Sequence, residues 1–184
     1  MRFSTILLSS FLAATSLAAP SPSTALDSIP SIADAKAKGV DVFGPIPNDA
    51  VKVKDGHYTA EPGSDAWHWI RAQIDIPNGS HPDDAEIEKR QGPANIGIGM
   101  FAQDSCRGQA AWFDDVTYNV NCYNTVNMYS VGISYRGLRN NEQLDFSRLS
   151  GNDWCGKYLY TAGKNTPVGC FNSQAINCFR LLAH

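Results

Sequence analysis

The sequence lacks the features that define several large classes of protein. Lys and Arg number 15 against 18 Asp and Glu, so we expect no nucleic-acid binding through a strong basic patch. Beyond the N-terminus no apolar run approaches the ~20 residues of a membrane-spanning helix. Cysteine is absent from residues 1–105, and only Pro93 and Pro167 of the ten prolines lie beyond residue 90. The chain therefore divides near residue 90.

The N-terminus has the pattern of a secretory signal peptide. Met1 and Arg2 give a positive start, and an apolar stretch follows from Ile6 to Leu17. Small residues at Ser16 and Ala18 predict cleavage after residue 18. We therefore expect a secreted, extracellular protein whose cysteines form disulfides.

Residues 19–90 are interpreted as a pro-region. Residues 1–90 hold 8 Lys and Arg against 12 Asp and Glu, whereas residues 91–184 hold 7 against 6. Eight prolines interrupt the segment and leave one short helix at 64–74, with Ser64 or Asp65 as its cap. The segment ends in Lys89-Arg90 after an acidic run, which resembles the sites cut by kexin-type proteases in the fungal secretory pathway. Such a protease would be a processing partner and would release residues 91–184 as the mature domain.

Strands dominate the sequence after residue 91. Apolar and small or polar residues alternate with a period of two in three stretches, 96–101, 116–123 and 129–135. This pattern is typical of half-buried β-strands with one face toward a core. No major helix is expected in this part of the chain.

An offset of 48 residues aligns the domain with itself without gaps, and predicts two repeats, 91–138 and 139–184. The matched positions include Phe101 with Leu149, Gly108 with Gly156, Trp112 with Tyr160, Cys122-Tyr123-Asn124 with Cys170-Phe171-Asn172, and Ser130 with Cys178.

Each repeat opens with a large apolar residue, four spacers, an anchor, one spacer and a glycine. With Ser130 about 22 residues after Gly108, the pattern resembles the Greek-key signature of the βγ-crystallin family, which includes small secreted microbial members. The resemblance implies an all-β fold, a duplicated Greek-key β-sandwich of two four-stranded units. It also implies that Gly108 allows a folded hairpin and that the Ser130 hydroxyl fastens it. Cys106, Leu149 and Cys178 depart from the signature.

Five cysteines allow at most two internal bridges, in fifteen arrangements. Because Cys178 takes the place of the fastening serine, we expect a bridge between Cys155 and Cys178. Cys106 with Cys122 would close the corresponding region of the first repeat. Cys170 is then left over, either as a thiol or as the link in a disulfide-linked dimer.

The mature domain offers little for catalysis. His57, His68 and His81 leave with the pro-region and only the terminal His184 stays, so neither a Ser-His pair nor a zinc site is expected. The segments aligned with the calcium-binding residues of microbial relatives do not keep their pattern. No spacing selects a pair among the carboxylates, which are Asp104, Asp114, Asp115, Glu142, Asp145 and Asp153. We predict no catalytic residues, no metal and no cofactor.

The predicted contact site is the cluster Tyr135, Arg136 and Arg139, at the junction of the repeats, because exposed Tyr and Arg dominate binding hot spots. The alternative interpretation of this cluster is a solvated linker. We expect three loops, at 124–130, 135–141 and 163–167, to form the contact surface. The predicted function is that of a matured, non-catalytic binding protein with an unidentified host or microbial target, either a virulence effector or a killer-toxin-like antimicrobial. The alternatives are a structural or cell-wall-associated protein and a small hydrolase, in which Glu142 would act with Arg136 or Arg139.

Overall fold

The computed structural model describes residues 22–80, 94–114 and 116–184. The predicted signal peptide and the Lys89-Arg90 pair lie outside them. The helices are α1 (Pro22–Asp27), α2 (Pro30–Ala37) and α3 (Asp65–Asp75). The strands are β1 (Val51–Lys54), β2 (His57–Ala60), β3 (Gly97–Gln103), β4 (Arg107–Phe113), β5 (Asn121–Ser134), β6 (Glu142–Ser150), β7 (Asp153–Ala162) and β8 (Gly169–Ala183).

The strands form one antiparallel sheet in the order β1-β2-β4-β3-β5-β8-β6-β7. In the middle of the sheet the long strands β5 and β8 pair with each other, and β3 and β6 flank them. The predicted β fold with disulfide bonds is therefore confirmed in its coarse form. Two of the eight strands, β1 and β2, come from the segment before residue 90.

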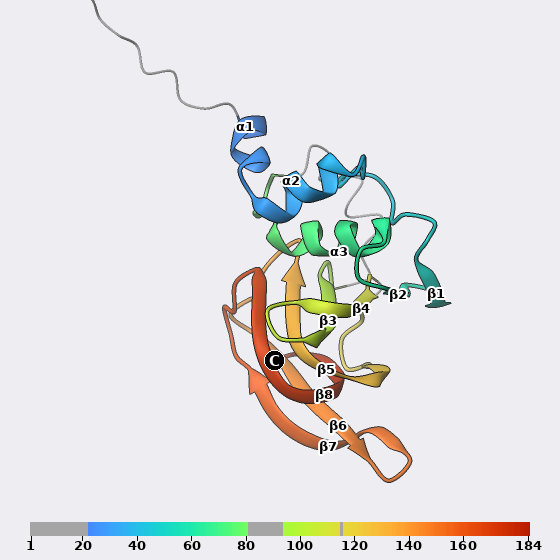
Figure 1. The fold of residues 1–184 in the computed structure, drawn as a ribbon. Helices are drawn as coiled ribbons and strands as arrows, with labels where there is room; N and C mark the ends of the chain where they lie inside the picture. The colour runs from blue at the N-terminus through green and yellow to red at the C-terminus, as the bar shows by residue number, and fades with distance from the viewer. Residues whose placement is uncertain (1–21, 81–93, 115) are drawn as a thin grey trace, which may run out of the picture.

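The N-terminal segment, by which we mean residues 22–80, is folded well beyond the one short helix expected of it. The expected helix is present as α3, and the Ser64 side chain caps it by accepting a hydrogen bond from the Trp67 amide. The segment also forms α2 and the β1–β2 hairpin, which sequence analysis did not predict. In Figure 1, α3 lies between α2 and the strands, so the segment covers part of the sheet.

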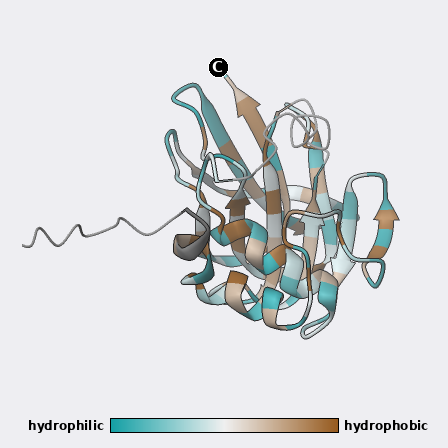
Figure 2. Ribbon diagram, turned by 90° about the horizontal axis from the view of Figure 1, so that it is seen from above, coloured by the Kyte–Doolittle hydropathy of each residue, from teal (hydrophilic) through white to brown (hydrophobic). Residues whose placement is uncertain are grey.

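The sheet has a hydrophobic cluster on each of its two faces. Along β3, Ile98 and Met100 contribute to one cluster, and Phe101 contributes to the other. Along β4, Ala111 and Phe113 belong to the first cluster and Trp112 to the second. Figure 2 shows hydrophobic and hydrophilic residues interleaved along the elements. The expectation of a half-buried strand is therefore wrong for β3, and β4, which was not among the expected strands, is also covered on both faces.

The second predicted strand, 116–123, is only partly present. Residues 121–123 begin β5, but the preceding residues form a turn in which Asn119 adopts a φ of 62°. The other two predicted strands correspond to β3 and to the end of β5. Within the described residues, no helix has the length and apolar character needed to cross a membrane.

Candidate functional site

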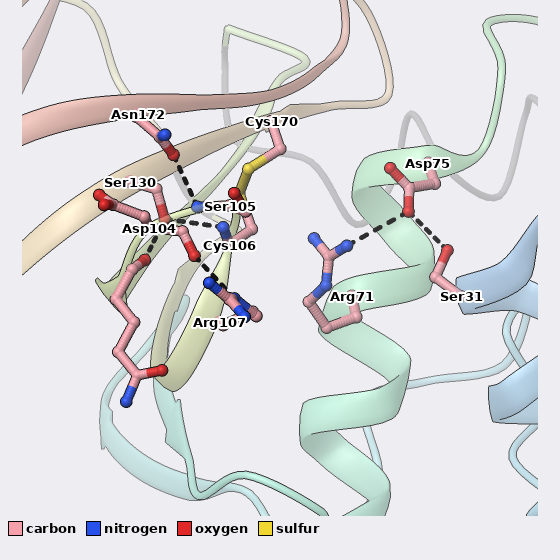
Figure 3. Close-up of a disulfide and its surroundings, with 11 residues drawn as sticks. Ser31, Arg71, Asp75, Asp104, Ser105, Cys106, Arg107, Ser130, Cys170 and Asn172 are labelled. Atoms are coloured by element: carbon pink, nitrogen blue, oxygen red, sulfur yellow. Dashed lines mark hydrogen bonds and ion pairs between the residues drawn. A yellow bond between two sulfur atoms is a disulfide. The ribbon is translucent and has the colours of Figure 1, made fainter.

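The turn between β3 and β4 is fastened to β5 by a serine hydroxyl. Ser130 Oγ accepts a hydrogen bond from the Cys106 amide at 2.8 Å and donates one to the Gln103 carbonyl at 2.5 Å. Gly108 adopts a φ of 73° just after the turn. Figure 3 shows Ser130 directed at this turn, beside the disulfide of Cys106. The predicted roles of Ser130 and Gly108 in a folded hairpin are thus confirmed.

Of the two predicted disulfides, one is present and the other is not. Cys155 pairs with Cys178 as expected, whereas Cys106 pairs with Cys170 and not with Cys122. Cys106 belongs to the hydrophobic cluster on the helix side of the sheet, and Cys122 belongs to the cluster on the opposite side. The sheet therefore separates these two sulfurs. Cys170 is neither left over nor available to link two chains, and Cys122 is a buried thiol outside both disulfides.

The Cys106–Cys170 disulfide should contribute more to stability than the second one. It spans a sequence separation of 64, against 23 for Cys155–Cys178. Chain entropy then assigns roughly 4 kcal/mol to the first and roughly 3.5 kcal/mol to the second. We expect Cys106→Ser with Cys170→Ser to lower the free energy of unfolding more than Cys155→Ser with Cys178→Ser, as measured by urea titration. Non-reducing peptide maps that join Cys106 to Cys122 would contradict this pairing.

The predicted contact residues Arg136 and Arg139 meet a buried carboxylate. Glu142, 1% exposed, accepts hydrogen bonds from both terminal nitrogens of Arg136, at 2.7 and 2.9 Å, and from the Arg139 amide at 2.8 Å. The Tyr118 hydroxyl donates to the same carboxylate at 2.5 Å. Burial alone would raise the pKa of Glu142, but the hydrogen bonds from Arg136, Tyr118 and the Arg139 backbone outweigh it and lower the pKa. We call these four residues the Glu142 network.

The three predicted contact residues differ in what they offer to a partner. Arg136 is 17% exposed and held in the Glu142 network, whereas the Arg139 side chain is 55% exposed. The Tyr135 hydroxyl donates to Asp114 Oδ1 at 3.0 Å, and its ring meets the Trp112 ring edge-on. Tyr135 and Arg136 therefore support the fold, and the contact role of the cluster stays a prediction.

Two of the three expected surface loops are connections between strands. Residues 135–141 join β5 to β6, and residues 163–167 lie between β7 and β8. The third, 124–130, is wrong as a loop because it lies inside β5. Within that stretch Met128 and Ser130 are buried, whereas Val126 and Tyr129 are exposed.

Sequence analysis missed an exposed aromatic area at the start of β5. The Tyr123 side chain is 44% exposed, and its ring lies parallel to the Trp154 ring of β7, with 6.5 Å between centroids. Tyr123 and Val126 also line a pocket of about 290 Å³, whose lining includes Val53 on β1. We call Val53, Tyr123, Val126 and Trp154 the Tyr123 surface. The signal in the sequence was an aromatic residue at an outward position of a strand.

The pocket beside the Tyr123 surface has both polar and apolar groups in its lining. Its residues are Val53, Lys54, His57, Thr59, Gln109, Tyr123, Asn124, Thr125 and Val126. Burial, with a smaller contribution from Lys54, lowers the pKa of His57 to about 4, so this imidazole is neutral at neutral pH. Two buried atoms of the lining, His57 Nε2 and Asn124 Nδ2, make no hydrogen bond to the described residues. The pocket therefore combines an aromatic ring with uncharged polar groups and one lysine.

In the described part of the chain, no group of three or more His, Cys, Asp and Glu side chains is placed to hold a metal ion. The carboxylate suggested for a hydrolase, Glu142, is buried and fully engaged in its network. No family model, curated protein or solved structure matches this chain.

Proposed function

We propose that the protein is a secreted, proteolytically matured, non-catalytic binding protein that acts as an effector or a killer-toxin-like antimicrobial. The observation that carries the proposal is the Tyr123 surface. It places two aromatic rings and two exposed valines at a pocket whose lining combines polar and apolar groups. Aromatic side chains with a hydrophobic body and a polar edge are enriched in binding hot spots. The two disulfides suit an oxidising, extracellular compartment.

The surroundings of the described carboxylates favour binding over turnover in this proposal. Among the described residues, Glu142 combines the deepest carboxylate burial with a paired arginine, and it is sealed from substrate. A hydrolase would need a carboxylate that reaches both solvent and a reacting bond. The hydrolase alternative is therefore the least supported of the three functions.

We also propose that β3–β5 and β6–β8 are two copies of one Greek-key unit of the βγ-crystallin type. The 48-residue offset carries Asn121, the first residue of β5, to Gly169, the first residue of β8. We call β3–β5 and β6–β8 the two strand triplets. In each triplet the first strand pairs with the other two. The fastening of the first hairpin by Ser130, and of the second by the Cys178 disulfide, supports the same relationship.

The binding proposal predicts that the Tyr123 surface controls biological activity. We expect Tyr123→Ala with Trp154→Ala to weaken growth inhibition of competing microbes, or the host-cell response, by about tenfold or more, because hot-spot residues are worth above 1.4 kcal/mol each. Dose-response curves of the secreted protein measure this. The matched control is Tyr158→Ala, since Tyr158 is 58% exposed on the same strand as Trp154 but lies outside the Tyr123 surface.

Other outcomes of these assays would favour an alternative function or another contact site. Binding to insoluble cell-wall polysaccharide without any growth or host response would favour the structural, cell-wall-associated alternative. Loss of activity on changing a single carboxylate to its amide, with the fold retained and the Tyr123 surface variant fully active, would favour the hydrolase. Loss of activity in Arg139→Ala alone would move the contact site to the junction between the triplets.

A further inference from the structure

The N-terminal segment and the β domain, residues 94–184, share one hydrophobic cluster. The segment contributes Trp69, Ile70 and Ile74 from α3, and the β domain contributes Phe101 and Trp112. Each of these five side chains is buried, and the Trp69 ring meets the Trp112 ring edge-on with 5.7 Å between centroids. Neither part could keep these side chains buried by itself in this arrangement.

Directional contacts fix the position of the segment on the β domain. Strand β2 pairs with β4 over four residue pairs, from His57 opposite Phe113 to Ala60 opposite Ala110. The Asp114 amide extends this ladder by donating to the Gly56 carbonyl at 2.7 Å. Removal of β2 would leave β4 as an open edge with unpaired backbone groups, which is a template for pairing with other chains.

Side-chain hydrogen bonds also cross the same boundary outside the β2–β4 ladder. Trp67 Nε1 donates to the Gly108 carbonyl at 2.7 Å, and Ser134 Oγ donates to the Gln73 carbonyl at 2.5 Å. The two partners in the β domain are the Gly108 carbonyl, which lies on β4, and the Ser134 hydroxyl, which lies on β5. The segment is thus attached along the length of α3 as well as at the sheet edge.

The β domain is shaped to receive α3. A Cβ added at Gly132 would lie 2.3 Å from Ile74 Cδ1, and one added at Gly99 would lie 3.3 Å from the same atom. Neither glycine has a positive φ, so their small size, and not their backbone freedom, is what the structure uses. The two glycines form the hollow that Ile74 fills.

We propose that the N-terminal segment stays bound after cleavage at Lys89-Arg90, so that the active protein is a non-covalent complex of two chains. This inference rests on the maturation step of the proposed function. The segment has no cysteine, and both disulfides lie within the β domain, so non-covalent contacts hold the two chains together. The retained segment keeps Val53, Lys54 and His57 in the wall of the pocket beside the Tyr123 surface. The segment is then a resident partner and not a discarded pro-region.

The experiment cuts the purified full chain with a kexin-type protease and asks whether the two products separate. We expect complete cleavage on a denaturing gel, together with a single peak in gel filtration at micromolar concentration and a native mass equal to the sum of both chains. Urea, and not reductant alone, should release the segment. A folded, monomeric β domain that elutes free of the segment after cleavage would overturn the proposal.

Two further measurements keep the outcome decisive. Hydrogen exchange at the amides of Ala110–Phe113 should be as slow in the cut protein as in the intact chain, because β2 still covers β4. Ile74→Asp should cause release after cleavage, whereas Lys52→Asp, at an exposed β1 position, should not. If Ile74→Asp prevents secretion, Ile74→Ala replaces it, with an expected rise in the dissociation constant of tenfold or more.

Failure of maturation can be told apart from failure of association. Secreted protein that begins before Gln91 in most molecules would contradict the maturation step but leave the result of cleavage in vitro intact. If the protease does not cut the purified chain, a recognition sequence for a sequence-specific protease inserted after Arg90 serves the same test. Separation of the chains after either cut contradicts the association, whatever the secreted protein contains.

Discussion

Replacement of Arg136 by alanine should lower the free energy of unfolding by about 3 kcal/mol or more. The substitution leaves the Glu142 carboxylate 1% exposed with two of its four donors removed. Breaking a buried ion pair by removing one partner typically costs about 3–5 kcal/mol, because the remaining charge is uncompensated. The 17% exposure of Arg136 places the expectation at the lower end of that range. Urea titration of the intact chain at neutral pH measures the change.

Two companion variants separate the ion pair from simple loss of a side chain. Arg139→Ala should cost about 1 kcal/mol or less, because the Arg139 side chain is largely exposed and its backbone amide continues to bind Glu142. Arg136→Met combined with Glu142→Leu should recover much of the loss, since it removes both charges at once. A single Arg136→Ala variant as stable as the wild type would refute the role assigned to the Glu142 network.

The Glu142 network also makes the free energy of unfolding depend on pH. The folded pKa of Glu142 lies below its ordinary value of 4.5, so its stabilising contribution is present above that pH and is lost as the pH falls through the folded pKa. In Arg136→Ala the hydrogen bonds and the charge of Arg136 no longer lower the pKa of Glu142, whereas burial still raises it. The loss of stability on acidification below pH 4.5 should therefore be smaller in the variant than in the wild type.

Local signals in the sequence predicted some elements and could have predicted others. Helix α3 was expected from the Ser64 cap and the spacing of its apolar residues, and it is present. The missed α2 begins at Pro30, the first position of a helix, where proline is favoured because its missing N–H would have no partner there. The missed hairpin has Asp55-Gly56 between β1 and β2, a strong local turn signal. Proline at position 30 is therefore a start signal for α2, and the hairpin, residues 51–60, contains no proline at all.

Burial on both faces of the sheet was harder to predict from the sequence. The β4 sequence Ala110-Ala-Trp-Phe113 is continuously apolar, as expected of a strand covered on both sides. The alternating glycines of β3 suggested an open face, but Gly99 is small because Ile74 of α3 lies against it. That reason involves a residue on another element, so alternation along one strand could not reveal it.

Long-range partners limited the prediction of the candidate site. The Cys155–Cys178 bridge followed from the offset between repeats, whereas Cys106–Cys170 crosses from one triplet to the other. The β5–β8 pairing sets Gly132 opposite Cys170, and Ser130 on the same strand holds Cys106. Arg136 resembled a surface cation because the sequence does not show that it is buried against Glu142, the first residue of the next strand. The Cys106–Cys170 contact depends on how strands pair, which a single sequence does not specify, whereas the burial of Arg136 and Glu142 depends on the packing around the connection between β5 and β6.

Replacement of Trp112 by alanine should lower the free energy of unfolding of the intact chain by about 3–5 kcal/mol. The indole is fully buried between Trp69 of the N-terminal segment and Tyr135 of the β domain, and it meets both rings edge-on. Its loss removes apolar burial and two aromatic contacts and leaves a cavity. The Nε1 donor of Trp112 makes no hydrogen bond to the described residues, so no polar contact is lost with the ring.

Because Trp112 joins the two parts, its replacement should act on both stability and association. Urea titration of the intact chain gives the first effect, and gel filtration after cleavage gives the second, where we expect the N-terminal segment to dissociate. Tyr158→Ala is the control, and a change of about 0.5 kcal/mol or less is expected there because the ring is mostly in solvent. Trp112→Phe should retain part of the stability and keep the chains together at high concentration. A Trp112→Ala protein that loses less than about 1 kcal/mol would show that the shared cluster contributes little, which is incompatible with a side chain buried on all sides.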